Sequence, residues 1–373
     1  MSSNVTSPRV QRTDWGLLFI VLTLVIVGSV MVYSASYGFA LMDGGIFEGQ
    51  PTYFVRRQII FALAGIVAML VLSRIDYRLY RRFALHILVL TLVVLVPMAI
   101  WGRWLLKKTH SIQPVEVAKI GVMIYIAVWL AGKGEQIRSL SVGLIPFALL
   151  LGFMSGLIVL QPDFSTAVIL VATSTAMFFA AGSDMKQLLI AFLFGGIALV
   201  FVAMLAPYRF DRIDLWLRGP FSDARGKGFQ TVQSLKALNL GGFLGVGLGQ
   251  SQQKFAIYAP HSDGVFAIIA EELGFVGAVA VMGLYGLWTW RGLRVARRAA
   301  DPFAMLLAVG LVCWVTFQAL LHVAVTTAST PFTGTVLPFV SSGGSSLISQ
   351  LAAVGILLNI ARGPRDAEAA GRS

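Results

Sequence analysis

Long apolar runs alternate with short polar segments along almost the whole chain. About ten of these runs contain few charged residues and approach the roughly 20 residues that a helix needs to cross about 30 Å of hydrocarbon. They lie at 15–36, 58–72, 84–101, 117–131, 142–160, 165–181, 188–205, 265–290, 303–325 and 347–360. The pattern therefore predicts an all-α membrane protein with about ten transmembrane helices.

One long polar segment, at 207–263, interrupts this pattern between the seventh and eighth runs. The other connections are short, so we expect residues 1–373 to form one polytopic domain. Segment 207–263 is then a large loop outside the membrane, and 362–373 is a short polar tail. The first apolar run is too long for a cleaved signal peptide, and it is predicted to be the first membrane anchor.

Composition agrees with a membrane protein. Hydrophobic residues make up 57% of the 373 residues and charged residues only 12%, values that exclude an ordinary soluble domain. Cys313 is the single cysteine, so an internal disulfide is excluded.

Lysine and arginine are concentrated in alternate connections, which assigns these connections to the cytoplasmic side. The residues concerned are Arg74, Arg78, Arg81, Arg82, Lys133, Arg138, Lys186, Arg291, Arg294, Arg297 and Arg298. Both termini are then cytoplasmic, in agreement with an even number of helices. The large loop 207–263 faces outward.

Other basic residues lie in connections that are predicted to face outward. The preference of lysine and arginine for the cytoplasmic side does not explain these residues. They are Arg56, Arg57, Arg103, Lys107, Lys108, Arg209, Arg212, Arg218, Arg225, Lys227, Lys236 and Lys254, in a chain of net charge +12. Two explanations remain open: contact with anionic lipid headgroups, or binding of a phosphate or pyrophosphate substrate at the outer membrane surface. The outward location excludes nucleic acid as a partner.

Three acidic positions beside the apolar runs are candidate functional residues. Glu116 and Lys119 are three residues apart, so they either form an ion pair at a helix end or line an outward-facing cavity. Asp163 either caps the sixth helix or faces such a cavity. Asp263 is the best-placed acid of the outer segment, although its position directly before the eighth run also suits a cap.

Two uncharged segments have unusual composition. Residues 331–346 are rich in proline, glycine and serine, and such a backbone at membrane depth must be buried, line a wet cavity or form a re-entrant connection. Residues 227–240 have apolar positions at helical spacing, which predicts a helix lying on the membrane surface. The glycines at 241–249 suggest a phosphate-binding loop only weakly, because they do not form the P-loop pattern.

Several motifs together resemble the SEDS family (shape, elongation, division and sporulation), which includes FtsW, RodA and SpoVE. They are MVYSAS at 31–36, Arg103-Trp104, Gln113-Pro114-x-Glu116-x-x-Lys119, Gln161-Pro162-Asp163, Gly228-x-Gln230-x-x-Gln233-Ser234-Leu235, Gly247-Leu248-Gly249, Ser262-Asp263, Glu271-Glu272-Leu273-Gly274 and Gly343-Gly344-Ser345-Ser346. The resemblance covers nearly the whole chain. It is stronger to the cell-division branch, FtsW, than to the elongation branch, RodA.

The resemblance implies ten transmembrane helices and a peptidoglycan glycosyltransferase that polymerises lipid II during septal synthesis. The family's essential aspartate falls on Asp263, which we expect to act as the base that deprotonates the attacking sugar hydroxyl. Positions that line the family's outward-facing cavity fall on Arg103, Glu116, Lys119 and Asp163. Further candidates for substrate binding are Arg57, Arg209, Lys254, Ser345 and Ser346.

The resemblance also implies partners and a location. A class B penicillin-binding protein, which is a transpeptidase, and other divisome membrane proteins are expected to bind the chain in the bacterial cytoplasmic membrane. A divalent cation, Mg²⁺ or Mn²⁺, beside the pyrophosphate suits this chemistry, but no cluster of ligands in the sequence identifies a metal site.

Three other functions remain open at the level of sequence. A lipid II flippase or another transporter would also need a polar cavity and broken helices. A RodA-type elongation polymerase would share the chemistry, and a noncatalytic scaffold would share the partners.

Overall fold

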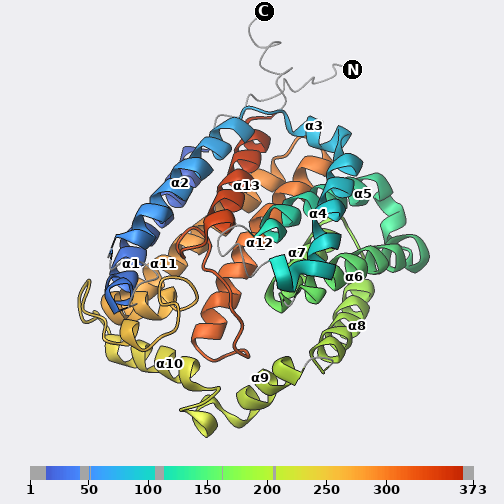
Figure 1. Cartoon of the computed structure of the whole chain (residues 1–373). Coiled ribbons are helices and arrows are strands. Elements are labelled where there is room, and N and C mark those ends of the chain that lie inside the picture. The colour runs from blue at the N-terminus through green and yellow to red at the C-terminus, as the bar shows by residue number, and fades with distance from the viewer. Residues whose placement is uncertain are drawn as a thin grey trace, which may run out of the picture.

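The computed structural model describes residues 14–42, 50, 52–105, 113–161, 163–204 and 207–363. Within these ranges every regular element is helical (Figure 1). The thirteen α-helices are α1 Trp15–Met42, α2 Tyr53–Leu72, α3 Tyr77–Arg82, α4 Ala84–Leu105, α5 Pro114–Lys133, α6 Ile145–Leu160, α7 Phe164–Ala180, α8 Met185–Met204, α9 Pro207–Arg218, α10 Phe229–Gly241, α11 Val265–Arg297, α12 Pro302–Thr326 and α13 Gly344–Arg362. Single turns of other helix types occur at Gly134–Arg138, Leu140–Leu144, Pro220–Asp223 and Gln253–Phe255.

The ten predicted apolar runs all form helices. Among the described residues, seven helices are long and apolar enough to cross a membrane, and shorter apolar helices occur at Ala84–Ile100, Phe164–Ala180 and Met185–Ala198. The protein is therefore an all-α, multi-pass membrane protein. Helices α3, α9 and α10 are additional, and they lie in the polar segments between the apolar runs.

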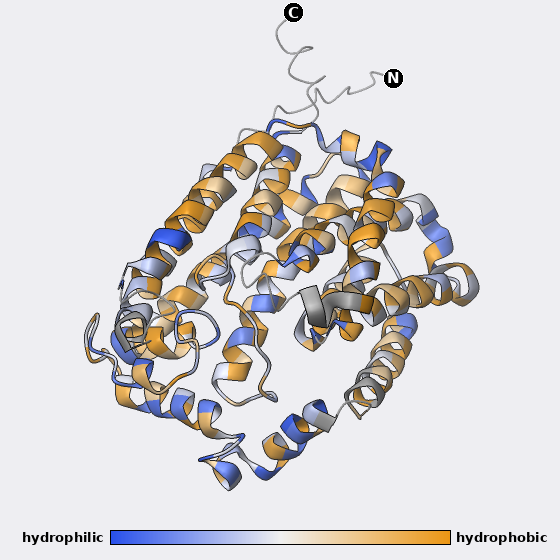
Figure 2. Cartoon of the chain, in the orientation of Figure 1, coloured by the Kyte–Doolittle hydropathy of each residue, from blue (hydrophilic) through white to orange (hydrophobic). Residues whose placement is uncertain are grey.

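The core lies around α13, α12 and α11, whereas other helices expose one apolar face. Of the most apolar stretch of α13, 83% of residues are buried, compared with 22% in α2. The outer faces of α2 and α8 carry exposed side chains such as Ile60, Leu63, Phe192 and Phe194, which suit contact with lipid. Figure 2 shows that hydrophobic residues predominate along the helices of the bundle and that hydrophilic residues are more frequent near its two ends.

The basic connections gather at one end of the bundle. Arg291 Nη1, in the last part of α11, lies 2.7 Å from Asp14 Oδ1 just before α1. Arg362 Nη1, at the end of α13, donates to the carbonyl of Ser73 after α2 at 3.3 Å. Helices α9 and α10 of the large loop lie at the opposite end (Figure 1), which agrees with the predicted grouping of connections.

Helix α10 forms within the segment predicted to be a surface helix. Its small residues Thr231, Ser234, Ala237 and Gly241 are buried, and the helix packs against α11. Phe229, from the predicted apolar face, is 38% exposed. Val232, from the same predicted face, is 3% exposed, so this face is partly buried. The position of α10 at the membrane surface stays a prediction.

Two of the glycines at 241–249, Gly241 and Gly245, allow close packing of the backbone. Gly274, with φ at 68°, breaks α11, and Gly245, with φ at 83°, lies directly against this break. The amides of Val246 and Gly247 donate to the carbonyls of Glu271 and Glu272, both at 3.0 Å. Left-handed φ angles favour glycine, and a Cβ at either site would collide with main-chain atoms. This packing accounts for glycine at 245 without a phosphate-binding loop.

Candidate functional site

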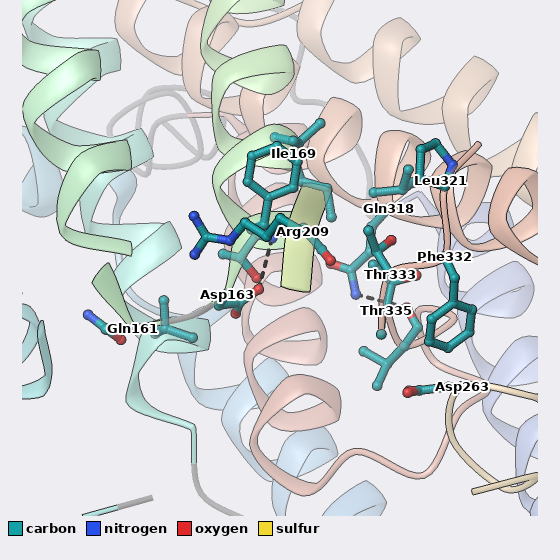
Figure 3. A pocket seen from close by; sticks show the side chains of 18 of the residues that line it. Gln161, Asp163, Ile169, Arg209, Asp263, Gln318, Leu321, Phe332, Thr333 and Thr335 are labelled. Carbon is teal, nitrogen blue, oxygen red and sulfur yellow. Dashed lines mark hydrogen bonds between the residues drawn. The ribbon is translucent and has the colours of Figure 1, made fainter. Parts of the chain in front are cut away.

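A cavity of about 650 Å³ opens between α5, α7, α9, α12 and the segment 330–336. Its lining includes five residues that the sequence selected, namely Glu116, Lys119, Asp163, Arg209 and Asp263. In Figure 3, Asp163 and Arg209 lie on one side of this cavity, and Asp263 and Phe332 lie on the other. The five residues come from four separate parts of the chain, and the fold brings them together.

Glu116 and Lys119 form a buried ion pair at the start of α5. Lys119 Nζ lies 2.9 Å from Glu116 Oε2, and the two side chains are only 2% and 5% exposed. The spacing of three residues places both on one face of the helix. The two residues therefore pair and also line a cavity, and the outward orientation of this cavity stays a prediction.

The ion pair is connected to α12 and to the uncharged segment beyond it. Lys119 Nζ is 3.5 Å from Gln318 Oε1 and 4.7 Å from the centre of the Trp314 ring. Gln318 Oε1 also accepts from Trp314 Nε1 at 2.9 Å, and Gln318 Nε2 donates to the carbonyl of Val336 at 3.0 Å. The cationic end of Lys119 is thus held by one carboxylate, one amide and one aromatic face.

Asp163 and Arg209 hold the junction of α6, α7 and α9. Asp163 caps α7, because its Oδ1 accepts from the amide of Thr166 at 3.0 Å, and it lines the cavity as well. Arg209 Nη2 donates to the carbonyl of Val159 at 2.9 Å, and its guanidinium lies 5.5 Å from the centre of the Phe164 ring. Arg209 therefore attaches α9 to the end of α6.

Asp263 lies in the loop directly before α11 and does not cap this helix. The N-cap residue is Gly264, and it forms no side-chain cap. Asp263 Oδ1 accepts instead from Ser262 Oγ at 3.2 Å. Burial raises the pKa of the Asp263 carboxyl to about 6, against the opposing effects of Ser262 and the Arg212 charge. A carboxyl with this pKa and without a capping role is suited to accepting a proton near neutral pH.

Gly334 leaves room for the Asp263 carboxylate. A Cβ at position 334 would lie 3.0 Å from Asp263 Oδ2, closer than ordinary van der Waals contact. We expect Gly334→Ala to displace this carboxylate and to lower the transferase activity proposed below by about tenfold, since small displacements of a catalytic group are costly. Gly286→Ala in α11, where no atom lies within 4 Å, is the matched control. Equal activity of the two variants in a polymerisation assay would show that the position of Asp263 does not depend on Gly334.

Arg212 also lines the cavity. The sequence analysis listed it among the outward basic residues but did not name it as a site candidate. Its Nη1 donates to the carbonyl of Phe332 at 3.2 Å, and its guanidinium lies 5.3 Å from the Phe332 ring and 6.0 Å from the Tyr208 ring. The spacing of Arg209 and Arg212 places them on one face of a helix, a signal that was available in the sequence. Gln318 carried no such signal, whereas Thr333 belongs to segment 331–346, for which the sequence offered a wet cavity as one reading, and residues 331–336 do line the cavity.

Two further sequence candidates, Arg57 and Lys254, do not line the cavity. Arg57 Nη1 donates to Tyr53 Oη at 3.1 Å on α2, and Lys254 Nζ donates to the carbonyl of Gly249 at 2.6 Å and lies 3.9 Å from Glu272 Oε1. The Arg103 side chain falls outside the described residues. The roles of these three residues in substrate binding stay predictions.

Ser345 and Ser346 lie next to the cavity residues. Ser345 Oγ accepts from the amide of Gln113 at 2.8 Å, and Ser346 Oγ donates to Glu116 Oε2 at 3.2 Å. Both serines thus join the start of α13 to the start of α5. Ser346 acts on the cavity through Glu116, and direct contact of either serine with a substrate stays a prediction.

A cluster of metal ligands is absent from the described part of the chain, where no three His, Cys, Asp or Glu side chains gather at one point. The side chains present therefore do not fit a protein-built site for a divalent cation.

Comparisons with known proteins agree over nearly the full length. A family model described as "Cell cycle protein" (FtsW, RodA, SpoVE) matches residues 15–366. "Probable peptidoglycan glycosyltransferase FtsW" of Trichlorobacter lovleyi is 39% identical, over 98% of this chain and 97% of the relative. "Stage V sporulation protein E" of Bacillus subtilis is 37% identical, over 97% of this chain and 99% of the relative.

Solved structures share the fold. One, described as "Structural coordination of polymerization and crosslinking by a peptidoglycan synthase complex", matches 95% of this chain and 98% of its own with a TM-score of 0.76 and 29% identity. The Rod shape determining protein RodA of Thermus thermophilus matches 95% of this chain and 98% of its own with a TM-score of 0.67 and 26% identity. On the family match and these relatives, the chain belongs to the FtsW/RodA/SpoVE family.

Proposed function

We propose that this protein is a peptidoglycan glycosyltransferase that polymerises lipid II into glycan strands at the outer face of the bacterial cytoplasmic membrane. The observation that carries the proposal is the position of Asp263, an acid without a capping role that faces a cavity lined by Lys119, Arg209 and Arg212. Relatives named peptidoglycan glycosyltransferase support it.

In the proposed reaction, Asp263 is the general base. Its carboxylate removes the proton from the 4-hydroxyl of the acceptor N-acetylglucosamine as that oxygen attacks the anomeric carbon of the donor strand. The bond from this carbon to the pyrophosphate oxygen breaks with inversion, and undecaprenyl pyrophosphate leaves with the electron pair. Cationic side chains of the cavity, Arg209 and Arg212 above all, stabilise the charge that develops on the leaving group.

The divalent cation expected from the sequence remains a prediction. Because the described residues provide no cluster of ligands, such a cation would be held mainly by the pyrophosphate. None of the steps assigned to Asp263 and the cationic side chains involves it.

The reaction should depend on pH through Asp263. A base must be deprotonated, and burial raises the pKa of this carboxyl from its ordinary value to about 6, so the active form is lost as the pH falls through 6. We expect the rate of polymerisation to decrease about tenfold per pH unit below this value and to be nearly constant above it. A pH–rate profile at saturating lipid II measures this. A rate that stays constant from about pH 5 to pH 7 would contradict the assignment of the base.

The direct test of the function uses the full-length protein, purified lipid II and a class B penicillin-binding protein. This partner is proposed because a solved relative is described as a peptidoglycan synthase complex that coordinates polymerization and crosslinking. Long glycan strands that are sensitive to muramidase are the expected product. We further propose a role in cell division, with other divisome membrane proteins as partners, since several relatives carry the name FtsW.

The alternative function is transport of lipid II, and the same assay distinguishes transport from polymerisation. A transporter needs polar contacts that continue across the membrane, whereas the charged residues of this cavity lie at the ends of α5, α7 and α9 and before α11. Movement of lipid II across vesicles without polymer formation would favour transport. Polymer formation by protein in detergent, where no second compartment exists, would favour the transferase.

A further inference from the structure

The backbone of the Asp263 loop is fastened to the turn that precedes α13. The Ser341 hydroxyl donates to the carbonyl of Ser262 at 2.8 Å, and the amide of Ser342 donates to the carbonyl of His261 at 2.9 Å. Ser262 and Ser341 are 79 positions apart in the chain. The turn therefore holds the two residues directly before Asp263, and it does so with serines that do not themselves line the cavity.

This turn is itself held in one conformation. Ser341 Oγ, which is buried, also accepts from the amide of Leu337 at 2.8 Å. Phe339 has a φ of 64°, in the left-handed region, and its amide donates to Gln350 Oε1 of α13 at 2.8 Å. A residue with a side chain keeps such a φ only where the contacts around it fix the backbone. Ser341 is thus a fixed support for the Asp263 loop.

The Asp263 loop contains a strained turn of the same kind. Ala259 has a φ of 51°, and its carbonyl accepts from the amides of Ser262 at 3.0 Å and of Gly264 at 3.3 Å. These bonds close the backbone around Asp263. The hydrogen bond from Ser341 reaches this closed turn at Ser262, so it restrains the residue next to the acid.

Ser262 connects this support to the carboxylate. Its carbonyl is held by Ser341, and its hydroxyl donates to Asp263 Oδ1 at 3.2 Å. A main chain that is fixed at Ser262 therefore keeps the hydroxyl directed at the carboxylate. Burial raises the pKa of Asp263 to about 6, and the Ser262 hydroxyl opposes this rise because a donor stabilises the charged form.

We propose that Ser341 is a positioning residue for the base, and that its hydroxyl fixes Ser262 and thereby the Asp263 carboxylate. The inference rests on the proposed function. Ser341 does not line the cavity, so it acts through Ser262 and does not touch the substrate. Part of the uncharged segment 331–346 would then serve to hold the catalytic acid in place.

Replacing Ser341 changes no other titratable group near Asp263. Those that line the same cavity come from α5, the start of α7 and α9, and they are Glu116, Lys119, Asp163, Tyr208, Arg209 and Arg212. The lining residues from α12 and from 330–336 are uncharged. Burial lowers the pKa of His261, in the same loop, to about 4, so this histidine is neutral near the pKa of the base. A shift of the pH–rate profile would thus report on the hydrogen bond to Asp263.

The test compares Ser341→Ala with Ser349→Ala. Ser349 lies on α13, and its hydroxyl is also buried but has no hydrogen-bond partner among the described residues. Both variants therefore lose one buried hydroxyl, and only the first loses a contact to the Asp263 loop. Polymerisation of lipid II by the full-length protein with its penicillin-binding partner is measured over a range of pH, and thermal unfolding establishes that each variant is folded.

We expect Ser341→Ala to lower kcat about tenfold and to change KM for lipid II less than about twofold, since the base is displaced while the binding groups remain. The midpoint of the acidic limb should move from about pH 6 toward about pH 7, because a carboxylate without its donor binds a proton more tightly. Ser341→Cys, with a weaker donor, should move it in the same direction by a smaller amount. Ser349→Ala should retain the profile of the unaltered chain.

A double variant tests whether Ser341 acts through Ser262. If it does, Ser262→Ala combined with Ser341→Ala should be no slower than Ser262→Ala alone. Independent effects would instead multiply, and this outcome would overturn the inference. An acidic limb that stays in place in both Ser341→Ala and Ser341→Cys would overturn it as well, as would equal shifts in Ser341→Ala and Ser349→Ala.

Failure of the proposed function gives a different result, because the unaltered chain would then form no polymer from lipid II at any pH. The positioning role can still be measured in that case, without turnover. An infrared titration follows the carboxyl band that Asp263→Asn removes, and Ser341→Ala should raise the pH at which this band disappears. An unchanged titration would contradict the positioning role, whatever reaction the protein catalyses.

Discussion

Asp263→Asn is expected to reduce the polymerisation of lipid II at least about a hundred-fold, the usual contribution of a general base. Asparagine keeps the size of the side chain and can still accept the hydrogen bond from Ser262 Oγ, so the loop before α11 should keep its shape. What the variant lacks is the carboxylate that takes the proton. The measurement is the initial rate of glycan synthesis from purified lipid II with the penicillin-binding partner, at equal amounts of folded protein.

Asp214→Asn provides the control for this variant. Asp214 also belongs to the outer loop, but its carboxylate forms an ion pair with Arg218 and does not line the cavity. Its replacement should leave the rate of synthesis close to that of the unaltered chain. If Asp263→Asn also retained the full rate, the base would have to be another group of the cavity, with Asp163 the first to test.

Lys119→Met should produce the largest loss of stability among single substitutions in the site. It leaves the Glu116 carboxylate buried without its cation, and breaking a buried ion pair in this way costs about 3–5 kcal/mol. Among the described residues, the Ser346 hydroxyl at 3.2 Å then remains as the hydrogen-bond donor to the Glu116 carboxylate. The free energy of unfolding can be followed by denaturant titration in detergent micelles.

Two further variants separate the buried charge from other effects of Lys119→Met. The double variant Glu116→Gln with Lys119→Met removes both charges and should recover most of the lost stability, since no uncompensated carboxylate remains. Arg218→Met breaks an exposed ion pair, in which Arg218 is 71% exposed, and should change stability very little. If the double variant were as unstable as Lys119→Met, the packing of the lysine stem would be the cause.

The membrane helices were predictable because a bilayer of fixed thickness requires apolar runs of nearly fixed length. All ten runs form helices, with differences at their ends. The polar segment 207–263 offers no such constraint, and the sequence located neither α9 nor the packing of α10 on α11. Gly241 lies directly against the backbone of Ala270 in α11, a close approach that hydrophobic spacing does not record.

The candidate site was partly predictable because regular helix geometry relates spacing in the sequence to contact in space. A spacing of three residues identified the pairing of Glu116 with Lys119, since a helix converts this spacing into contact. The environment of Lys254 was not predictable, because its partner Glu272 follows eighteen positions later and on another element. Position alone also could not separate a capping role for Asp263 from a free carboxylate, a distinction that depends on Gly264 being the N-cap residue.

The break in α11 at Gly274 restricts where residues can be inserted or deleted during evolution. The amides of Phe275 and Val276 donate to the carbonyls of Gly242 and Phe243, while Val246 and Gly247 bond to the residues before the break. One inserted or deleted residue between Phe243 and Val246 would put the two pairs of bonds out of register with each other. The turn at Pro220–Asp223 contains no buried residue. Insertions and deletions that preserve the fold should therefore accumulate at that turn and be absent from the glycine-rich segment.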